Sequence, residues 1–388
     1  FVFKNNISND YMASVFKYTS RPLNVITNTV VTSRMGNLSQ QFGHSHIALV
    51  HENANSGYWS KDMFRHSLNA DLCVFPGKGV ANAAQDFCGY VPSTNILIRP
   101  QGMYRHNFPE VSLEKSYASV RLELGLPDDA KIVLGCGNIE ERKGVDMFFE
   151  TALKYCDLGE TCSNTYFVWI GGIVPAQSST RDWGLALLNK LKALKSTKFF
   201  IIAGVTKVDR YYQACDLFYL PSRKDPFPGV VLEAMACKKP ILAFAGATDV
   251  ADAFGHGLGG TLLQKFDSKE AAQKVHSYLS NPNLCVQAGE HNDNVIQSKY
   301  KFEHYSRAIF DKLKSLKSGN ILLSESDLVM SFVAPVYKTP LLYLQQLLSS
   351  LESQTYANWE LCLAGVELES DTRAYLNFKL LCSPSSFI

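Results

Sequence analysis

The stretch "DLFYLPSRKDPFPGVVLEAMACKKPILAF", residues 216–244, contains a complete strand–helix–strand unit. An apolar run at its start ends in a proline-rich turn, and the segment "GVVLEAMAC" that follows indicates a short apolar helix. The closing run "PILAF" is again apolar and predicts a second strand. Strands that alternate with helices are joined by crossovers, so this unit predicts a parallel sheet.

The same alternation extends from about residue 130 to residue 265. Apolar runs such as "KIVLGCG", "TYFVWIGG" and "KFFIIAG" alternate with helical segments such as "GVDMFFETALKYC". This pattern predicts a doubly wound α/β domain, for which we expect the bounds 111–320. Residues 1–110 also alternate short apolar runs with polar breaks, which predicts a second Rossmann-like domain that lacks its first strands.

The bulk composition excludes several classes of protein. The 388 residues are 46% hydrophobic and 19% charged, which is typical of a globular protein. A net charge of +2 and the lack of basic runs argue against a nucleic-acid partner. The ten cysteines form no CxxC pair, so we expect no zinc site and a reducing, cytoplasmic compartment. The start "FVFKNN" and the end "LLCSPSSFI" suggest a piece of a longer polypeptide.

Two carboxylates flank the proline-rich turn. Asp225 precedes the predicted helix and Glu233 lies about one turn into it, while Pro228 and Gly229 stand at the helix start. The amides and the positive dipole end of a helix start favour phosphate, and carboxylates accept hydrogen bonds from sugar hydroxyls. The turn therefore suits a nucleoside diphosphate sugar. The alternative is that Asp225 only caps the helix and Glu233 is a solvated residue.

The longer string "SRKDPFPGVVLEAMACKKPILAF" resembles the signature of retaining GT-B glycosyltransferases of glycosyltransferase family 4. A second match, "GCGNIEERKGVDMFFETA", is similar to the glycine-rich strand end and Arg-Lys-Gly turn of that family. The resemblance covers about residues 20–310. It implies two Rossmann-like domains facing a cleft, with the acceptor side in residues 1–110 and the nucleotide-sugar site in residues 111–320.

The resemblance also implies roles for individual residues. Lys143 would hold the donor diphosphate, Asp225 would contact hydroxyls of the donor sugar, and Glu233 would bind the ribose. The turn formed by Phe227, Pro228, Gly229, Val230 and Val231 would face the phosphates with its backbone amides. The lysine would neutralise charge that grows on the leaving diphosphate. The family usually has Glu where this chain has Asp225, which bears on the sugar that is selected.

Further residues follow from the same resemblance. Many family members carry an arginine soon after the glycine-rich strand end, where this chain has Gly137 and Asn138, so Arg142 is the candidate substitute. The strand end "HIALVHENANSGYW" assigns His51 to the donor sugar, and its alternative role is to cap the strand. The loop around Val205 is where we expect the base to bind.

The implied activity is transfer of a sugar, with retention, from a nucleoside diphosphate sugar to a glycan or lipid-linked acceptor. The leaving phosphate would help to deprotonate the acceptor, so no side-chain base, metal or further cofactor is expected. An acceptor of this kind agrees with surface polysaccharide biosynthesis and with a peripheral association at the inner face of a membrane. The alternative is an inactive nucleotide-binding scaffold within a larger glycan-assembly protein.

The tail, residues 327–388, has a different character. Its segment "VMSFVAPVYKTPLLYLQQLLSSLESQTYANWELCLAG" resembles the opening of a family 2 glycosyltransferase of the GT-A type. About 60 residues cannot complete such a domain, so the tail is interpreted as the truncated start of a second transferase module.

Overall fold

The structure is a computed structural model of the chain. It describes residue 16 and residues 24–54, 59–89, 95–103, 113–159, 164–173, 179–194, 198–205, 207–254, 257–317, 330–337, 341–353, 359–366, 370–371 and 373–375.

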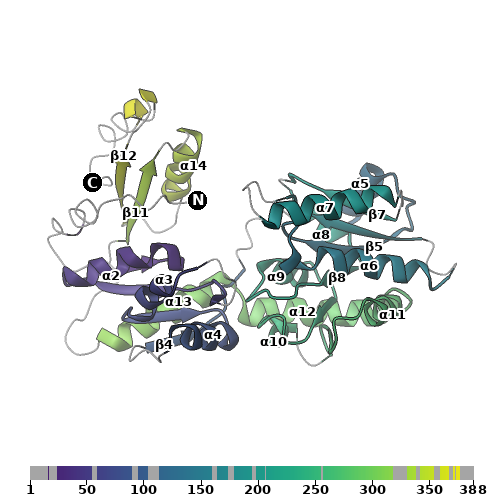
Figure 1. The fold of residues 1–388 in the computed structure, drawn as a ribbon, viewed down its shortest axis with the longest axis horizontal. Helices are drawn as coiled ribbons and strands as arrows, with labels where there is room; N and C mark the ends of the chain where they lie inside the picture. Colours follow the sequence, from purple (N-terminus) through teal and green to yellow (C-terminus); the bar gives the residue numbers. More distant parts are fainter. Residues whose placement is uncertain are drawn as a thin grey trace.

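Six parallel strands form the larger sheet, in the order β10-β9-β8-β5-β6-β7. Their bounds are β5 Lys131–Cys136, β6 Thr165–Ile170, β7 Phe199–Ile202, β8 Leu217–Leu220, β9 Ile241–Phe244 and β10 Gly260–Leu263. The chain winds outward from β5 to β7, returns to place β8 beside β5, and then winds the other way (Figure 1). The sheet is therefore doubly wound, as the sequence predicted, and its switch point lies between β5 and β8.

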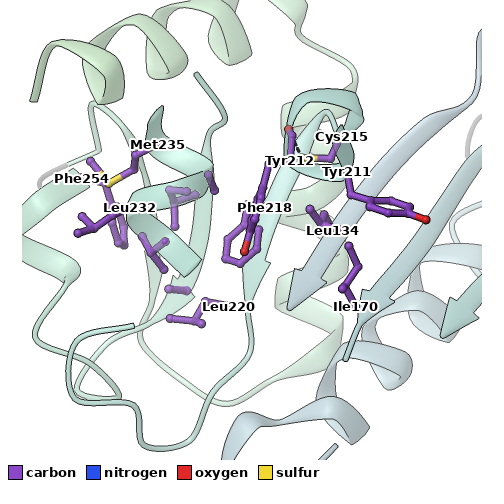
Figure 2. Packing of buried hydrophobic residues seen from close by; sticks show 14 of the residues in the cluster. Leu134, Ile170, Tyr211, Tyr212, Cys215, Phe218, Leu220, Leu232, Met235 and Phe254 are labelled. Atoms are coloured by element: carbon purple, nitrogen blue, oxygen red, sulfur yellow. Dashed lines mark hydrogen bonds between the residues drawn. The ribbon is translucent and has the colours of Figure 1, made fainter. Parts of the chain in front are cut away.

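Helices cover both faces of this sheet, and each face has its own core. Their bounds are α5 Leu113–Leu124, α6 Val145–Cys156, α7 Ser179–Ala193, α8 Asp209–Ala214, α9 Gly229–Ala236, α10 Ala251–Phe254, α11 Ser268–Leu279 and α12 Pro282–Lys299. One core joins α8 and α9 to the sheet through residues such as Tyr212, Phe218 and Leu232 (Figure 2). The other core centres on Phe148 of α6, whose ring contacts Phe167 and Trp169.

The smaller sheet has four parallel strands in the order β1-β2-β3-β4. The elements of this lobe are β1 Asn24–Thr27, η1 Val30–Thr32, α2 Ser33–Gln41, β2 Ser45–Leu49, α3 Lys61–Leu68, β3 Leu72–Phe75, α4 Lys78–Cys88 and β4 Asn95–Ile98. The α/β alternation that the sequence predicted for this part of the chain is confirmed.

Helix α13, Phe302–Lys317, packs against the smaller sheet although it follows the elements of the larger lobe in the chain (Figure 1). Its residues Tyr305, Ile309 and Leu313 share one buried cluster with Ile47 and Leu72 and their neighbours. The residues 302–317, assigned by chain order to the second predicted domain, thus complete the core of the first lobe.

The tail forms a separate strand–helix–strand unit. Strands β11, Met330–Tyr337, and β12, Trp359–Val366, pair in parallel over eight residues, and α14, Leu341–Glu352, connects them (Figure 1). Among the described residues, no helix is both long and apolar enough to cross a membrane.

One carboxylate links the two lobes across a long sequence separation. Asp249, in the loop after β9, accepts a hydrogen bond from the backbone N–H of Val80 at 3.1 Å, in the first turn of α4. A Cβ on Gly77 or Gly79 would lie 2.1 Å or 2.5 Å from a carboxylate oxygen of Asp249, so a side chain at either position would displace Asp249 from this contact. The negative charge also suits the positive dipole end of α4.

His46 makes the smaller lobe sensitive to acid. Its ring is fully buried, and Nε2 shares a hydrogen bond with Thr27 Oγ1 at 2.8 Å. Burial lowers the pKa of His46 to about 4, against the opposing effect of Asp71. Between pH 6.5 and 4 the unfolded chain therefore binds the proton that the folded chain excludes, so the free energy of unfolding falls as the pH falls, by up to about 1.4 kcal/mol per pH unit.

We accordingly expect hydrogen exchange of the β1 and β2 amides to accelerate as the pH falls through this window, after correction for the intrinsic pH dependence of exchange. His46→Gln should flatten that response, whereas His276→Gln on α11 should leave it unchanged. If amide exchange in His46→Gln still accelerates as the pH falls, another group causes the acid response.

Candidate functional site

The candidate site lies at the switch point of the larger sheet. Strands β5 and β8 are neighbours there, and each continues at its carboxyl end into a loop that leads to a helix. After β5 come Gly137, with φ of 151°, the short helix η4, Glu141–Lys143, and Gly144, with φ of 69°. After β8 comes the turn 221–228 that precedes α9. Open α/β sheets bind ligands at such a point.

The two loops meet through a cluster of charges. Lys143 Nζ donates to Asp225 Oδ2 at 2.6 Å, and Arg142 Nη1 lies 3.4 Å from Asp225 Oδ1. Arg142 also pairs with Glu140 at 2.6 Å, and Ser222 Oγ donates to Asp225 Oδ2 at 3.2 Å. Asp225 is only 5% exposed, so these partners compensate a buried carboxylate. The structure thus brings together three residues that the sequence singled out.

Gly137 also belongs to this cluster. A Cβ at Gly137 would lie 3.3 Å from Cδ of Lys143, so the stem of the lysine passes directly over the glycine. Its positive φ is one that residues with side chains rarely adopt. Gly137 therefore allows the chain to turn and leaves room for the side chain of Lys143.

The start of α9 faces open space. Pro228 is the N-cap of the helix, and a Cβ on Gly229 would meet no atom within 4 Å. The amides of Gly229 and Val230 belong to the first turn, where intrahelical partners are lacking. The Val231 N–H donates to Pro228 O at 3.1 Å, and its side chain is buried in the core. Of the predicted amides, Val231 is thus engaged within the protein.

Glu233 lies one turn further along α9, on the same end of the sheet. Burial raises the pKa of its carboxyl, and the hydroxyl of Tyr212 beneath it acts in the opposite direction. Tyr212 comes from α8 and is itself fully buried; burial, with Cys136 and Glu233 beside it, raises its pKa well above its ordinary value. Glu233 is therefore a partly desolvated acceptor for hydrogen bonds.

His51 lies at the carboxyl end of the other sheet, after β2. Its Nε2 is 3.0 Å from Asn28 Oδ1 and 3.1 Å from Gln101 Nε2, and its backbone N–H donates to Glu52. Burial lowers the pKa of His51, with Glu52 opposing, so the ring is neutral at neutral pH. A neutral imidazole can donate to or accept from a hydroxyl, but its described contacts remain within the smaller lobe.

Two other predicted residues lie around the cluster. Phe227 packs against the core with its ring 6.1 Å from that of Tyr300. Val205 follows β7, two strands away from the switch point, and also packs on that core. Among the described residues, no group of three or more His, Cys, Asp or Glu side chains is arranged to hold a metal ion.

Sequence reasoning missed several polar residues that the structure adds. Asn28, Gln101 and Glu52 accompany His51, while Ser222, Tyr212 and Arg223 support the cluster on the larger sheet. Asn28, Glu52 and Gln101 stand within a few residues of a predicted strand end, which was an available signal. The contacts of Tyr212 and Arg223 depend on the packing of distant segments, so no local pattern indicated them.

Comparison with known proteins agrees with this geometry. Residues 118–295 match the family model described as Glycosyl transferases group 1. The chain is 28% identical over 219 residues to the alpha-galactosylglucosyldiacylglycerol synthase of Streptococcus pneumoniae, with 55% of this chain and 53% of that protein covered. It is 29% identical over 175 residues to a D-inositol 3-phosphate glycosyltransferase of Thermobispora bispora, covering 42% and 39%. The chain spans about half or less of the length of these relatives.

Solved structures show the same fold at low sequence identity. Anabaena HepE in complex with UDP superposes with a TM-score of 0.67 and 18% identity, over 78% of this chain and 82% of that chain. Sucrose-phosphate synthase from Thermosynechococcus elongatus gives 0.66 and 19%, over 80% and 78%. The two parallel sheets are those of GT-B Rossmann-like domains. The match to the glycosyl transferases group 1 model lies in the larger lobe, which holds the charge cluster, and it is the kind of family that the two sequence motifs resembled.

Proposed function

We propose that the chain is a retaining glycosyltransferase that moves a sugar from a nucleoside diphosphate sugar to an acceptor. The observation that carries the proposal is the pairing of Lys143 and Arg142 with Asp225, in the turn that leads to the open start of α9, with Glu233 one turn into the helix. Cations and helix amides there suit a diphosphate, and the carboxylate suits ribose hydroxyls. The donor we propose carries UDP, the nucleotide present in the HepE complex.

Each residue then has a defined task. Lys143 and Arg142 neutralise the charge that develops on the leaving diphosphate, and Glu233 orients the nucleoside. Without ligand the two cations are balanced by Asp225 and Glu140, so a diphosphate must compete with these carboxylates. Asp225, released from the lysine, becomes available to donor-sugar hydroxyls, and neutral His51 offers a hydrogen bond from the other lobe.

The test is nucleotide binding followed by turnover. UDP, GDP, ADP and TDP are each added at millimolar concentration, and thermal unfolding is followed; a nucleotide that binds only the folded chain raises stability by about 2.7 kcal/mol at a hundredfold excess over Kd. We expect a shift with UDP and release of UDP from a UDP-sugar. No shift with any nucleotide would contradict the proposal, and binding without turnover would favour the scaffold alternative.

Glu233→Gln should weaken UDP binding by about 10-fold or more, because a neutral amide accepts weaker hydrogen bonds from the ribose. The same change should stabilise the unliganded protein at neutral pH. The raised pKa means that the folded chain holds the Glu233 proton more tightly than the unfolded chain does, so wild-type stability is lost as the pH rises above about 4.5.

The difference in unfolding free energy between Glu233→Gln and wild type should therefore grow from pH 4 to pH 7. Urea unfolding at the two pH values measures it, and calorimetric titration measures UDP binding. Glu150→Gln on the exposed surface of α6 is the control for both. Unchanged UDP affinity in Glu233→Gln would remove Glu233 from the ribose site.

We further propose a glycan or lipid-linked acceptor, within surface polysaccharide assembly on the cytoplasmic side of a membrane. One relative is named for a glycolipid that it synthesises and another for D-inositol 3-phosphate, and these names support small or lipid-linked acceptors. Screening such acceptors with the identified donor tests this, and transfer to none of them would contradict it.

The tail is proposed to begin a second, GT-A-type transferase module. Its support is the parallel pair β11 and β12 with α14 between them, the order with which such modules open. Leu348, fully buried on α14, can be replaced by Asp to disrupt this unit. We expect UDP affinity of the whole chain to stay unchanged, and a loss would show that the tail serves the donor site instead.

A further inference from the structure

Arg223 joins the two loops of the candidate site at several points. Its guanidinium donates to both carboxylate oxygens of Asp146, at 2.8 Å and 2.7 Å, and to the carbonyl of Glu141 at 2.7 Å. Its backbone N–H donates to the carbonyl of Arg142 at 2.8 Å. All three partners flank Lys143 in the chain. A single residue of the β8 loop therefore holds the turn 141–144 on both sides of Lys143.

The paired contact is geometrically specific. A guanidinium fork and a carboxylate form two parallel hydrogen bonds that fix orientation as well as distance, which a lysine cannot reproduce. Asp146 lies in the first turn of α6, so its pair with Arg223 connects the β8 loop to the helix that Lys143 precedes. The side chains of Arg223 and Asp146 are 35% and 26% exposed, so the pair is partly shielded from water.

These contacts of Arg223 should matter most when a donor is bound. In the unliganded chain, Lys143 is also held by Asp225 on the same β8 loop. A diphosphate that draws Lys143 away from Asp225 removes that direct tie, while the contacts of Arg223 involve neither the ammonium group nor Asp225. Backbone pairing between β5 and β8 covers Val133 with Leu217 and Leu134 with Phe218 and does not extend into the loops, where Arg142 Nη1 also donates to the carbonyl of Lys224 at 2.9 Å.

We propose that Arg223 is a positioning residue, which holds the turn 141–144 so that Lys143 is aimed at the diphosphate of the donor. The inference rests on the proposed function and deepens it, because it names a residue that acts through Lys143 without touching the substrate.

The experiment compares UDP with uridine. Arg223→Met should weaken UDP binding by about 10-fold, equal to about 1.4 kcal/mol, and leave uridine binding within about twofold, because uridine lacks the diphosphate that Lys143 meets. Arg223→Lys should resemble Arg223→Met, since it keeps the charge but loses the fork. Titration calorimetry or ligand-observed NMR gives both affinities.

Arg210→Met is the matched control. Arg210 pairs with Glu123 at 2.7 Å with similar exposure, 33% and 38%, on α8 and α5 and away from the turn. It should change neither affinity. Equal losses of UDP and uridine binding in Arg223→Met, or unchanged UDP binding, would overturn the inference.

A double-mutant cycle tests the route of the effect. If Arg223 acts through Lys143, adding Arg223→Met to Lys143→Met should change UDP affinity by less than about twofold. Fully additive losses would overturn the proposal. A wild-type chain that binds neither UDP nor uridine would instead refute the donor site itself, and the inference with it.

Discussion

Replacing Lys143 with methionine should lower turnover of the donor by about 100- to 1,000-fold, since the charge that stabilises the leaving diphosphate is lost. The same variant should be destabilised by about 1 to 3 kcal/mol. Asp225 is buried and loses its 2.6 Å partner, although Ser222 and Arg142 remain close to it.

A second substitution separates the two effects. Lys143→Met combined with Asp225→Asn removes both members of the ion pair, so stability should recover while turnover stays low. Lys154→Met, which breaks an exposed pair with Asp157, should change stability by less than about 0.5 kcal/mol and leave turnover intact. Initial rates of UDP release and urea unfolding provide the measurements. Full turnover in Lys143→Met would exclude Lys143 from the chemistry.

Gly144→Ala should be the most disruptive single change in the site. Gly144 has φ of 69°, and a Cβ there would lie 2.0 Å from the carbonyl oxygen of Pro221, a backbone atom that cannot rotate away. The left-handed conformation costs alanine about 1 to 2 kcal/mol, and separating the two loops adds to this. We expect a total loss of about 3 kcal/mol or more in unfolding free energy, together with loss of UDP binding.

Gly125 offers the matched comparison. Its φ is 63°, but a Cβ there would meet nothing within 4 Å, so Gly125→Ala carries only the backbone cost. Gly125→Ala should lose about 1 to 2 kcal/mol of unfolding free energy and bind UDP normally. Thermal unfolding with and without UDP compares the two variants. If both variants lose the same unfolding free energy, the close approach of Gly144 to Pro221 contributes little to stability.

Much of the fold was predictable from the sequence, because most strands of the larger sheet are continuous apolar runs with a glycine or proline close to one end. Strand β10 was missed, since its four residues, which begin with the second glycine of a Gly-Gly pair, give little periodicity. Helix α12 was also missed, although Asn281 as its N-cap and Pro282 at its start were visible signals. That α13 packs on the first sheet could not be read from chain order.

The candidate site was predictable as a set of residues and less so as an arrangement. Lys143, Asp225 and Glu233 lie on the loop and helix that the motifs indicated. Their pairing was not predictable, because Lys143 and Asp225 are 82 residues apart and meet only through the adjacency of β5 and β8. The assignment of Asp225 to sugar hydroxyls, and the roles of His51 and Val205, remain predictions.

The contact of Asp249 with α4 has a thermodynamic consequence. Asp249 N–H donates to Pro226 O at 2.9 Å, and Asp225 N–H donates to Ala247 O at 2.8 Å, so the loop that reaches the other lobe is hydrogen-bonded to the donor loop. Any donor whose binding shifts this loop changes the free energy of the contact between lobes. Linkage is reciprocal, so an acceptor that displaces α4 from Asp249 would alter donor affinity by the same factor.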